Sequence, residues 1–209
     1  MTTADEALAR NDRYVRDFVE ALHLCPYAKR CRESGKLHRR VVPSREAAFE
    51  AVQAVEALPG EPEVALLIFP GEPAAGLDSA RAFETFGAAL RDRMFAAHGG
   101  NPPFYLVAFH PDLPRDLLDA HRAVQFIRRS PDPTLQMVRA SVLRAVRAGS
   151  PAGGSMFVDS SKLTLEQLMT LHSPLSLADR IAEANLEMLK REGPDRLEAQ
   201  LAALRPSVK

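Results

Sequence analysis

The sequence predicts an α/β domain with a sheet of three to four mostly parallel strands, flanked by helices, and a helical C-terminal region. Three short runs of aliphatic and aromatic residues predict the strands, at 37–43, 63–69 and 104–109. Helical segments separate these runs, and parallel neighbours need crossover connections of this kind. The alternation of strand and helix therefore favours a mostly parallel sheet.

The helices of the first two thirds of the chain follow from periodicity and capping signals. Apolar residues recur at helical spacing within 4–22 after an acidic start, which predicts an amphipathic helix. Ser44 is expected to cap a second helix, and 77–97 should form a third. We expect Pro133 to begin a further helix that runs to Arg147.

The C-terminal third of the chain is predicted to be mainly helical. Helices are expected at 163–171 and 175–192, after a weak strand at 156–158. Residues 194–209 should form a short peripheral helix and tail. The length of 209 residues suits a single domain with a core of its own.

Composition restricts the range of functions. The 27 basic and 27 acidic residues cancel, so no overall charge favours nucleic acid or an anionic membrane. The N-terminus lacks the apolar stretch of a signal peptide, and the longest aliphatic run is too short to span a bilayer. We therefore expect a soluble, cytoplasmic protein with no nucleic-acid or membrane partner, which could bind a small anionic ligand.

Cys25 is the first candidate for chemistry. It precedes Pro26 and predicted helical turns, and Lys29 and Arg30 follow it closely. A helix start and nearby cations lower the pKa of a thiol and favour the nucleophilic thiolate. An inert, buried cysteine fits the sequence equally well. The spacing from Cys25 to Cys31 matches neither a redox pair nor a zinc site, so we predict no metal.

His110 is the second candidate because it follows the third predicted strand directly. Open α/β sheets present their site residues at such carboxyl ends. An acid–base role is one interpretation, with Asp112 orienting the ring. The alternative is a hydrogen-bonded structural histidine, with Asp112 capping the next turn.

The turn at 128–134 is the third candidate. Arg129 and Ser130 lie in it, just before the predicted helix, where main-chain N–H groups and a guanidinium can hold a phosphate or carboxylate. Arg139 would lie within reach. The alternative is an ordinary capping turn with solvated arginines.

These segments, in this order, resemble an uncharacterised bacterial family, the domain of unknown function 1415. They read Leu-Cys-Pro-Tyr-Ala at 24–28, Phe-His-Pro-Asp at 109–112 and Arg-Arg-Ser-Pro-Asp-Pro-Thr at 128–134. The resemblance covers residues 14–192. Tyr27 replaces a phenylalanine of the family pattern, Arg128 replaces an asparagine, and 150–174 resembles an insertion. The resemblance implies no reaction, but it brings Cys25, His110 and Arg129 forward together.

The leading hypothesis is an enzyme that acts on a small anionic metabolite through a thiol, an imidazole and a guanidinium. The assigned residues are Cys25 and His110 as catalytic groups and Lys29, Arg129, Ser130 and Arg139 as anion-binding groups. One alternative is a non-enzymatic ligand- or haem-binding sensor that uses Cys25. Another is a scaffold protein in which the three motifs are structural. The sequence leaves the cofactor open, and the enzyme hypothesis requires all three motifs to meet at one cavity.

Overall fold

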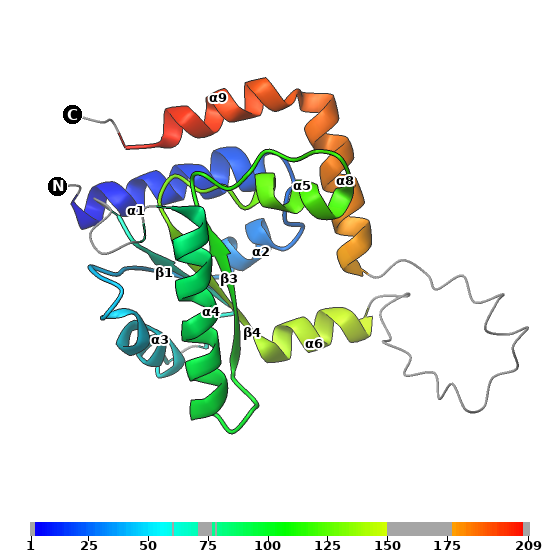
Figure 1. Cartoon of the computed structure of the whole chain (residues 1–209). Coiled ribbons are helices and arrows are strands. Elements are labelled where there is room, and N and C mark those ends of the chain that lie inside the picture. Colours follow the sequence, from blue (N-terminus) through cyan, green and yellow to red (C-terminus); the bar gives the residue numbers. More distant parts are fainter. Residues whose placement is uncertain (1–2, 60, 71–76, 78, 150–176, 207–209) are drawn as a thin grey trace, which may run out of the picture.

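A computed structural model describes residues 3–59, 61–70, 77, 79–149 and 177–206 (Figure 1). The helices and strands, in chain order, are α1 (Ala4–Arg13), the π-helix η1 (Tyr14–Glu20), α2 (Ala28–Glu33), β1 (Leu37–Val41), α3 (Ala48–Glu56), β2 (Val64–Ile68), α4 (Ala80–Ala97), β3 (Phe104–Phe109), α5 (Ala120–Ile127), β4 (Thr134–Arg139), α6 (Ala140–Gly149), α8 (Leu177–Glu192) and α9 (Pro194–Leu204). The strands form one sheet with helices on both faces, which confirms the α/β class.

The sheet is mixed, so the prediction of mostly parallel strands is wrong. Its strand order is β1-β2-β4-β3. β1 and β2 are parallel, whereas β4 is antiparallel to both of its neighbours. The strand that reverses the sheet is therefore β4, the last of the described strands, which inserts between β2 and β3.

The predicted helix at 133–147 is helical only in its second half. β4 occupies Thr134–Arg139, and α6 follows it without a break. Leu135 and Met137 are fully buried, whereas Gln136 and Val138 are half-buried. This alternation is the period of a strand with its two faces in different surroundings. Because β4 is short and continuous with α6, its pattern merges with that of the helix.

The three predicted strands are confirmed as β1, β2 and β3. The helices expected at 4–22, 77–97 and 175–192 are confirmed as α1 with η1, α4 and α8. Ser44 does not cap α3, because that helix begins at Ala48 and its N-cap residue is Ala47.

The strand expected at 156–158 and the helix expected at 163–171 lie outside the described residues. The same holds for the segment at 150–174 that the family resemblance suggested to be an insertion.

The sheet separates two hydrophobic cores. The helices α3 and α4 cover one face, and α1, η1, α5, α8 and α9 cover the other (Figure 1). β2 contributes to both, because Ala65 and Leu67 point into the first core and Leu66 and Ile68 into the second. This explains why the sequence of β2 is apolar without alternation.

The C-terminal helix α9 is an integral part of the second core. Leu197, Leu201 and Leu204 are buried there, although the sequence predicted a peripheral segment from residue 194. In the described part of the chain, no helix has both the length and the apolar character that crossing a membrane requires.

Candidate functional site: an arginine-lined pocket beside β3

The register of the sheet fixes where each predicted site residue lies. Ile68 pairs with Thr134, and Thr134 pairs with Phe109, so β2 and β3 end where β4 begins. We call this the carboxyl end of the sheet. Val64 pairs with Val138 at the other end, which we call the amino end. At about 3.3 Å per residue the two ends lie about 13 Å apart.

Cys25 lies at the amino end of the sheet, just before α2. The loop after α2 is hydrogen-bonded to the residue before β2: the carbonyl of Lys36 accepts the N–H of Glu63 at 3.0 Å. Cys31 in α2 is close enough to Cys25 for the two thiols to interact electrostatically. His110 follows β3 at the carboxyl end. The structure therefore does not bring Cys25 and His110 to a common cavity.

Burial dominates the ionisation of both thiols. It raises the pKa of Cys25, and the main-chain N–H groups of Tyr27 and Ala28 oppose it. It also raises the pKa of Cys31 to about 11, with a smaller contribution from Glu63. The expectation of a lowered pKa at Cys25 is thus wrong, because burial outweighs these hydrogen bonds.

Lys29 and Arg139 also lie at the amino end. Lys29 is exposed on α2. Arg139 ends β4, where its Nε donates to the carbonyl of Pro62 at 2.8 Å and its guanidinium lies 4.7 Å from the centre of the Phe104 ring. Neither side chain belongs to the same end of the sheet as the turn at 128–134.

His110 is buried at the carboxyl end, and its ring is held from two sides. The N–H of Asp112 donates to Nδ1 at 3.1 Å, so Nδ1 must be an acceptor. Nε2 lies 3.3 Å from the carbonyl of Leu77, which can only accept. The ring is therefore the tautomer with its proton on Nε2, and it also packs against Phe83. This supports the structural interpretation of His110.

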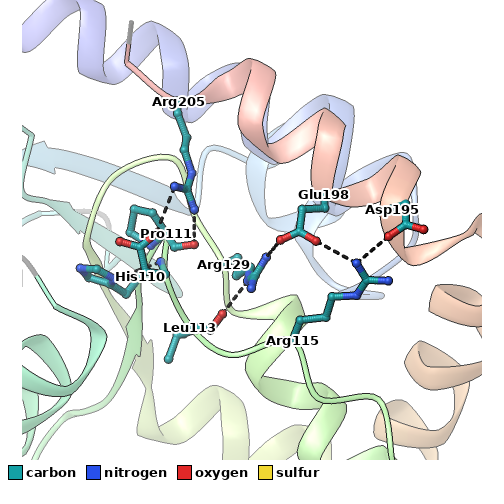
Figure 2. Close-up of polar contacts among 9 residues, drawn as sticks. His110, Pro111, Leu113, Arg115, Arg129, Asp195, Glu198 and Arg205 are labelled. Carbon is teal, nitrogen blue, oxygen red and sulfur yellow. Dashed lines mark hydrogen bonds and ion pairs between the residues drawn. The ribbon is translucent and has the colours of Figure 1, made fainter. Parts of the chain in front are cut away.

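Arg129 is engaged in contacts within the protein. Its Nε donates to the carbonyl of Leu113 at 2.6 Å, and its Nη1 pairs with Glu198 of α9 at 2.6 Å. The guanidinium also lies 5.1 Å from the centre of the Phe126 ring. Figure 2 shows the His110 ring pointing away from Arg129. Arg129 thus ties the loop after β3 to α9.

Two further contacts hold this region. Arg205 donates to the carbonyl of Pro111, on the same loop (Figure 2). Ser130 is buried and donates its hydroxyl to the carbonyl of Asp132 at 2.6 Å. The predicted anion clamp of Arg129 and Ser130 is therefore part of the internal bonding of the protein.

Arg128, the neighbour of Arg129, has a different environment. Its side chain is half-buried, and burial lowers the pKa of its guanidinium, although the charge of Glu84 opposes this effect. No hydrogen bond or ion pair joins the guanidinium of Arg128 to any of the described residues. A desolvated cation without a bonded partner is costly, which makes Arg128 the best candidate for a ligand contact.

Arg128 lines a cavity of about 270 Å³ between α4 and β3. The residues around it are Glu84, Gly87, Ala88 and Arg91 from α4, Leu106, Val107 and Ala108 from β3, Leu135 from β4, and Arg128. Two arginines and one glutamate are thus its charged groups. A pocket of this size, with a few charged side chains and apolar walls, suits a small polar ligand.

Glycine at position 87 allows α4 to pack closely against the sheet. A Cβ atom at this position would lie 3.2 Å from Cδ2 of Leu135 and 3.7 Å from Cβ of Ala108. Glycine therefore lets α4 approach β3 and β4 closely and shapes the floor of the pocket.

The sequence motif brought Arg129 forward, whereas the guanidinium without a bonded partner among the described residues is that of Arg128. Arg128 and Arg129 are adjacent and chemically identical, and the contacts with Leu113 and Glu198, both outside the motif, are what set Arg129 apart. Helix α5 ends at Ile127, and in the turn that follows it the two side chains point in different directions. No local signal in the sequence distinguishes them.

Comparison with known proteins identifies the family of the chain. The model of the family described as "Protein of unknown function (DUF1415)" matches residues 6–170. The chain belongs to this family. No curated protein and no solved structure matches the chain significantly. Membership of DUF1415 assigns no reaction, so the function of this DUF1415 protein has to be argued from its site.

The described part of this DUF1415 protein holds no group of three or more histidine, cysteine, aspartate or glutamate side chains that could bind a metal ion. The matched residues include Cys25, His110 and Arg128, whereas α8 and α9 follow the matched region.

Proposed function

We propose that this protein binds a small anionic metabolite in the pocket between α4 and β3, with Arg128 as the main anion-binding group. The observation that carries the proposal is the half-buried guanidinium of Arg128, which has no bonded partner among the described residues. An arginine fork holds a carboxylate or phosphate through two parallel hydrogen bonds. An anion would therefore offset the cost of burying this charge.

Arg91 and Glu84 complete the charged groups of the pocket. Arg91 adds a second positive charge on α4, which favours an anion further. Glu84 accepts hydrogen bonds and would favour a ligand that also carries an N–H or O–H donor. The combination is better suited to an organic acid with a donor group than to a simple inorganic anion.

The proposal keeps the anionic ligand of the sequence-based hypothesis and changes the residues that bind it. No cysteine, histidine or serine is among the described residues that line the pocket. Binding, rather than thiol chemistry, is therefore the activity that the pocket supports best. A reaction at Cys25 would need a second site at the amino end of the sheet.

The test is a binding measurement on the full chain at low salt. Phosphate, acetate, succinate and citrate are screened by thermal shift, and any anion that stabilises the protein is titrated by calorimetry. The variants are Arg128→Gln, which removes the charge, and Arg144→Gln as a matched control. Arg144 is exposed on α6 and does not line the pocket.

We expect at least one anion to bind, with an affinity that falls about tenfold or more in Arg128→Gln, because a charge-assisted hydrogen bond is lost. Arg144→Gln should bind within about twofold of the wild type, since the charge of an exposed residue outside the pocket is weakened by the high dielectric constant of water. The proposal fails if no anion gives saturable binding, or if Arg128→Gln binds as tightly as the wild type.

A further inference from the structure

β3 is an edge strand, and the pocket lies along it. In the order β1-β2-β4-β3, β3 has a partner on one side only among the strands of the described residues. Such a strand presents main-chain N–H and C=O groups without a ladder partner on its other side, where another extended chain can pair with it. Figure 1 shows α4 crossing the sheet next to β3, so helix and strand edge are neighbours.

The ladder identifies which main-chain groups face outward. The N–H of Ala140 donates to the carbonyl of Pro103 at 2.8 Å, so these two residues form a hydrogen-bonded pair. In an antiparallel ladder such pairs alternate, and every second residue of β3 from Pro103 therefore faces β4. The main-chain N–H and C=O groups of Leu106 and Ala108 therefore point away from β4. The N–H of His110 follows the same alternation, because it donates outward to the carbonyl of Arg128 at 3.2 Å.

The open groups of β3 border the anion pocket. Leu106, Val107 and Ala108 all line it, together with Arg128. Side chains of successive strand residues point to opposite faces, so a cavity that touches all three must reach the main chain of the strand. An anion bound to Arg128 would thus lie next to main-chain donors and acceptors that have no ladder partner.

We propose that the ligand is an extended, peptide-like carboxylate, such as the C-terminal end of a peptide or an N-acyl amino acid. Its carboxylate binds Arg128, and its amide group forms main-chain hydrogen bonds with the edge of β3 at Leu106 and Ala108. This inference rests on the proposed anion-binding function and specifies its ligand class. Glu84 provides a further acceptor for an N–H of the ligand.

Charge favours an acidic chain end over a second copy of this protein. β3 reads Phe-Tyr-Leu-Val-Ala-Phe and contains no acidic residue. If β3 of a second copy paired with this edge, that strand would supply no anion to Arg128. A peptide that ends in a carboxylate satisfies both the strand edge and the guanidinium.

The experiment compares four probes by calorimetry. They are acetate, N-acetyl-trialanine with a free carboxylate, the same peptide with a C-terminal amide, and the free acid with its last amide nitrogen methylated. The proteins are the wild type, Arg128→Gln and Ala108→Pro. Proline at 108 removes an outward N–H while leaving the hydrogen-bonded pairs with β4 intact, a position that edge strands tolerate.

We expect the free-acid peptide to bind about tenfold more tightly than acetate, than the C-terminal amide and than the methylated peptide. Ala108→Pro should weaken the peptide by a similar factor, and weaken it more than it weakens acetate. The methylated probe tests the strand edge in the unaltered protein, so the result does not depend on how well Ala108→Pro folds.

Two outcomes separate this inference from the proposed function. If acetate binds through Arg128 but methylation and Ala108→Pro have no effect on the peptide, the peptide-like ligand is excluded and the anion site stands. If no probe of this set binds but another anion of the screen binds through Arg128, the inference fails and the anion site stands; if no anion of either set binds, both proposals fail. A molar mass that doubles with concentration in light scattering, and that Ala108→Pro restores to a monomer, would overturn the inference in favour of a second copy at this edge.

Discussion

Arg10 and Asp132 form a buried, two-pronged ion pair between the first helix and the turn that precedes β4. Nε of Arg10 lies 2.8 Å from Oδ2 of Asp132, and Nη2 lies 2.9 Å from Oδ1. The carbonyl of Asp132 also accepts hydroxyl hydrogen bonds from Ser130 at 2.6 Å and Thr134 at 2.9 Å. The N-terminal helix thus fixes the turn from which Arg128 and β4 are both positioned.

Removal of either partner of this pair should destabilise the protein strongly. We expect Asp132→Ala or Arg10→Ala to lower the free energy of unfolding by about 3–5 kcal/mol, because each leaves a buried charge without its partner. Urea denaturation at neutral pH measures the change. Arg196→Ala serves as the control, since Arg196 forms an exposed pair with Glu192 on the surface and should cost about 0.5 kcal/mol or less.

A double variant distinguishes the ion pair from a simple loss of packing. In Arg10→Met with Asp132→Leu both charges are gone and apolar groups fill the space, so we expect a smaller loss than in either alanine variant. A loss equal to the sum of the losses in Arg10→Met alone and Asp132→Leu alone would mean that the two side chains act independently.

The sequence was sufficient to locate those strands whose apolar runs are bounded by turn residues. β2 is an example, because the run from Val64 to Phe69 ends at Pro70. β4 escaped because Pro133 also suits a helix start and because α6 continues directly from Arg139. The wrong prediction of a mostly parallel sheet followed from missing this strand, since β4 is the strand that runs antiparallel to its neighbours.

The candidate site was only partly predictable for a different reason. The motif at 128–134 contributes Arg128 to the pocket, whereas residues 109–112 are not among those that line it. What distinguishes Arg129 from Arg128 is its bonding to Leu113 and Glu198, which lie outside the motif. The position of Cys25 depends on the contact between the loop after α2 and the start of β2. Such long-range contacts have no signature within a single motif.

The ion pair of Glu20 and Arg32 should make stability depend on pH in the acidic range. Arg32 donates to both carboxylate oxygens, at 2.7 and 2.9 Å, and this lowers the pKa of Glu20 below its ordinary value of 4.5. A carboxyl group whose pKa is lowered by folding stabilises the folded state at pH values above its pKa in the unfolded state. The contribution is lost as the pH falls through the folded pKa.

We therefore expect Glu20→Gln to be less stable than the wild type at pH 7. The difference should shrink as the pH falls below about 4.5, where the wild-type carboxyl begins to take up a proton in the unfolded state. Urea denaturation at a series of pH values from 7 to 3 measures it. Glu50→Gln, on the exposed side of α3, should show no such narrowing. A difference for Glu20→Gln that is constant across this range would contradict the assignment.

The two cysteines should react slowly at neutral pH. Burial raises the pKa of both thiols, so we expect iodoacetamide to alkylate Cys25 and Cys31 more slowly than free cysteine at pH 7.4. Cys31 should be the slower of the two because it is buried, whereas Cys25 is half-buried. Peptide mass spectrometry of timed samples measures each rate.

In urea both rates should approach that of free cysteine, which serves as the internal control for this measurement. An alkylation rate at Cys25 above that of free cysteine in the folded protein would indicate a stabilised thiolate. That result would revive the nucleophile hypothesis for the amino end of the sheet.

Arg129→Met should lower the stability of the protein. The substitution keeps the aliphatic part of the side chain but removes the hydrogen bond to Leu113 and the ion pair with Glu198. We expect a loss of about 2 kcal/mol in the free energy of unfolding, because a buried carbonyl and a carboxylate lose their charged donor. Hydrogen exchange should also rise at the loop after β3. An unchanged exchange rate there would mean that Arg129 does not hold this loop to α9.

Arg128→Met should change the free energy of unfolding in the opposite direction, although it is the same substitution at the adjacent residue. The guanidinium of Arg128 forms no hydrogen bond or ion pair with the described residues, and burial disfavours its charge. Methionine keeps the apolar contacts and removes the desolvated cation, so we expect the ligand-free protein to become about 1 kcal/mol more stable. The measurement is urea denaturation in a low-salt buffer without multivalent anions. The anion found in the binding screen should then stabilise the wild type but not Arg128→Met, because a ligand stabilises only the protein that binds it. If Arg128→Met is destabilised as much as Arg129→Met, the guanidinium contributes to the fold, and its role as the anion-binding group of the pocket loses its physical basis.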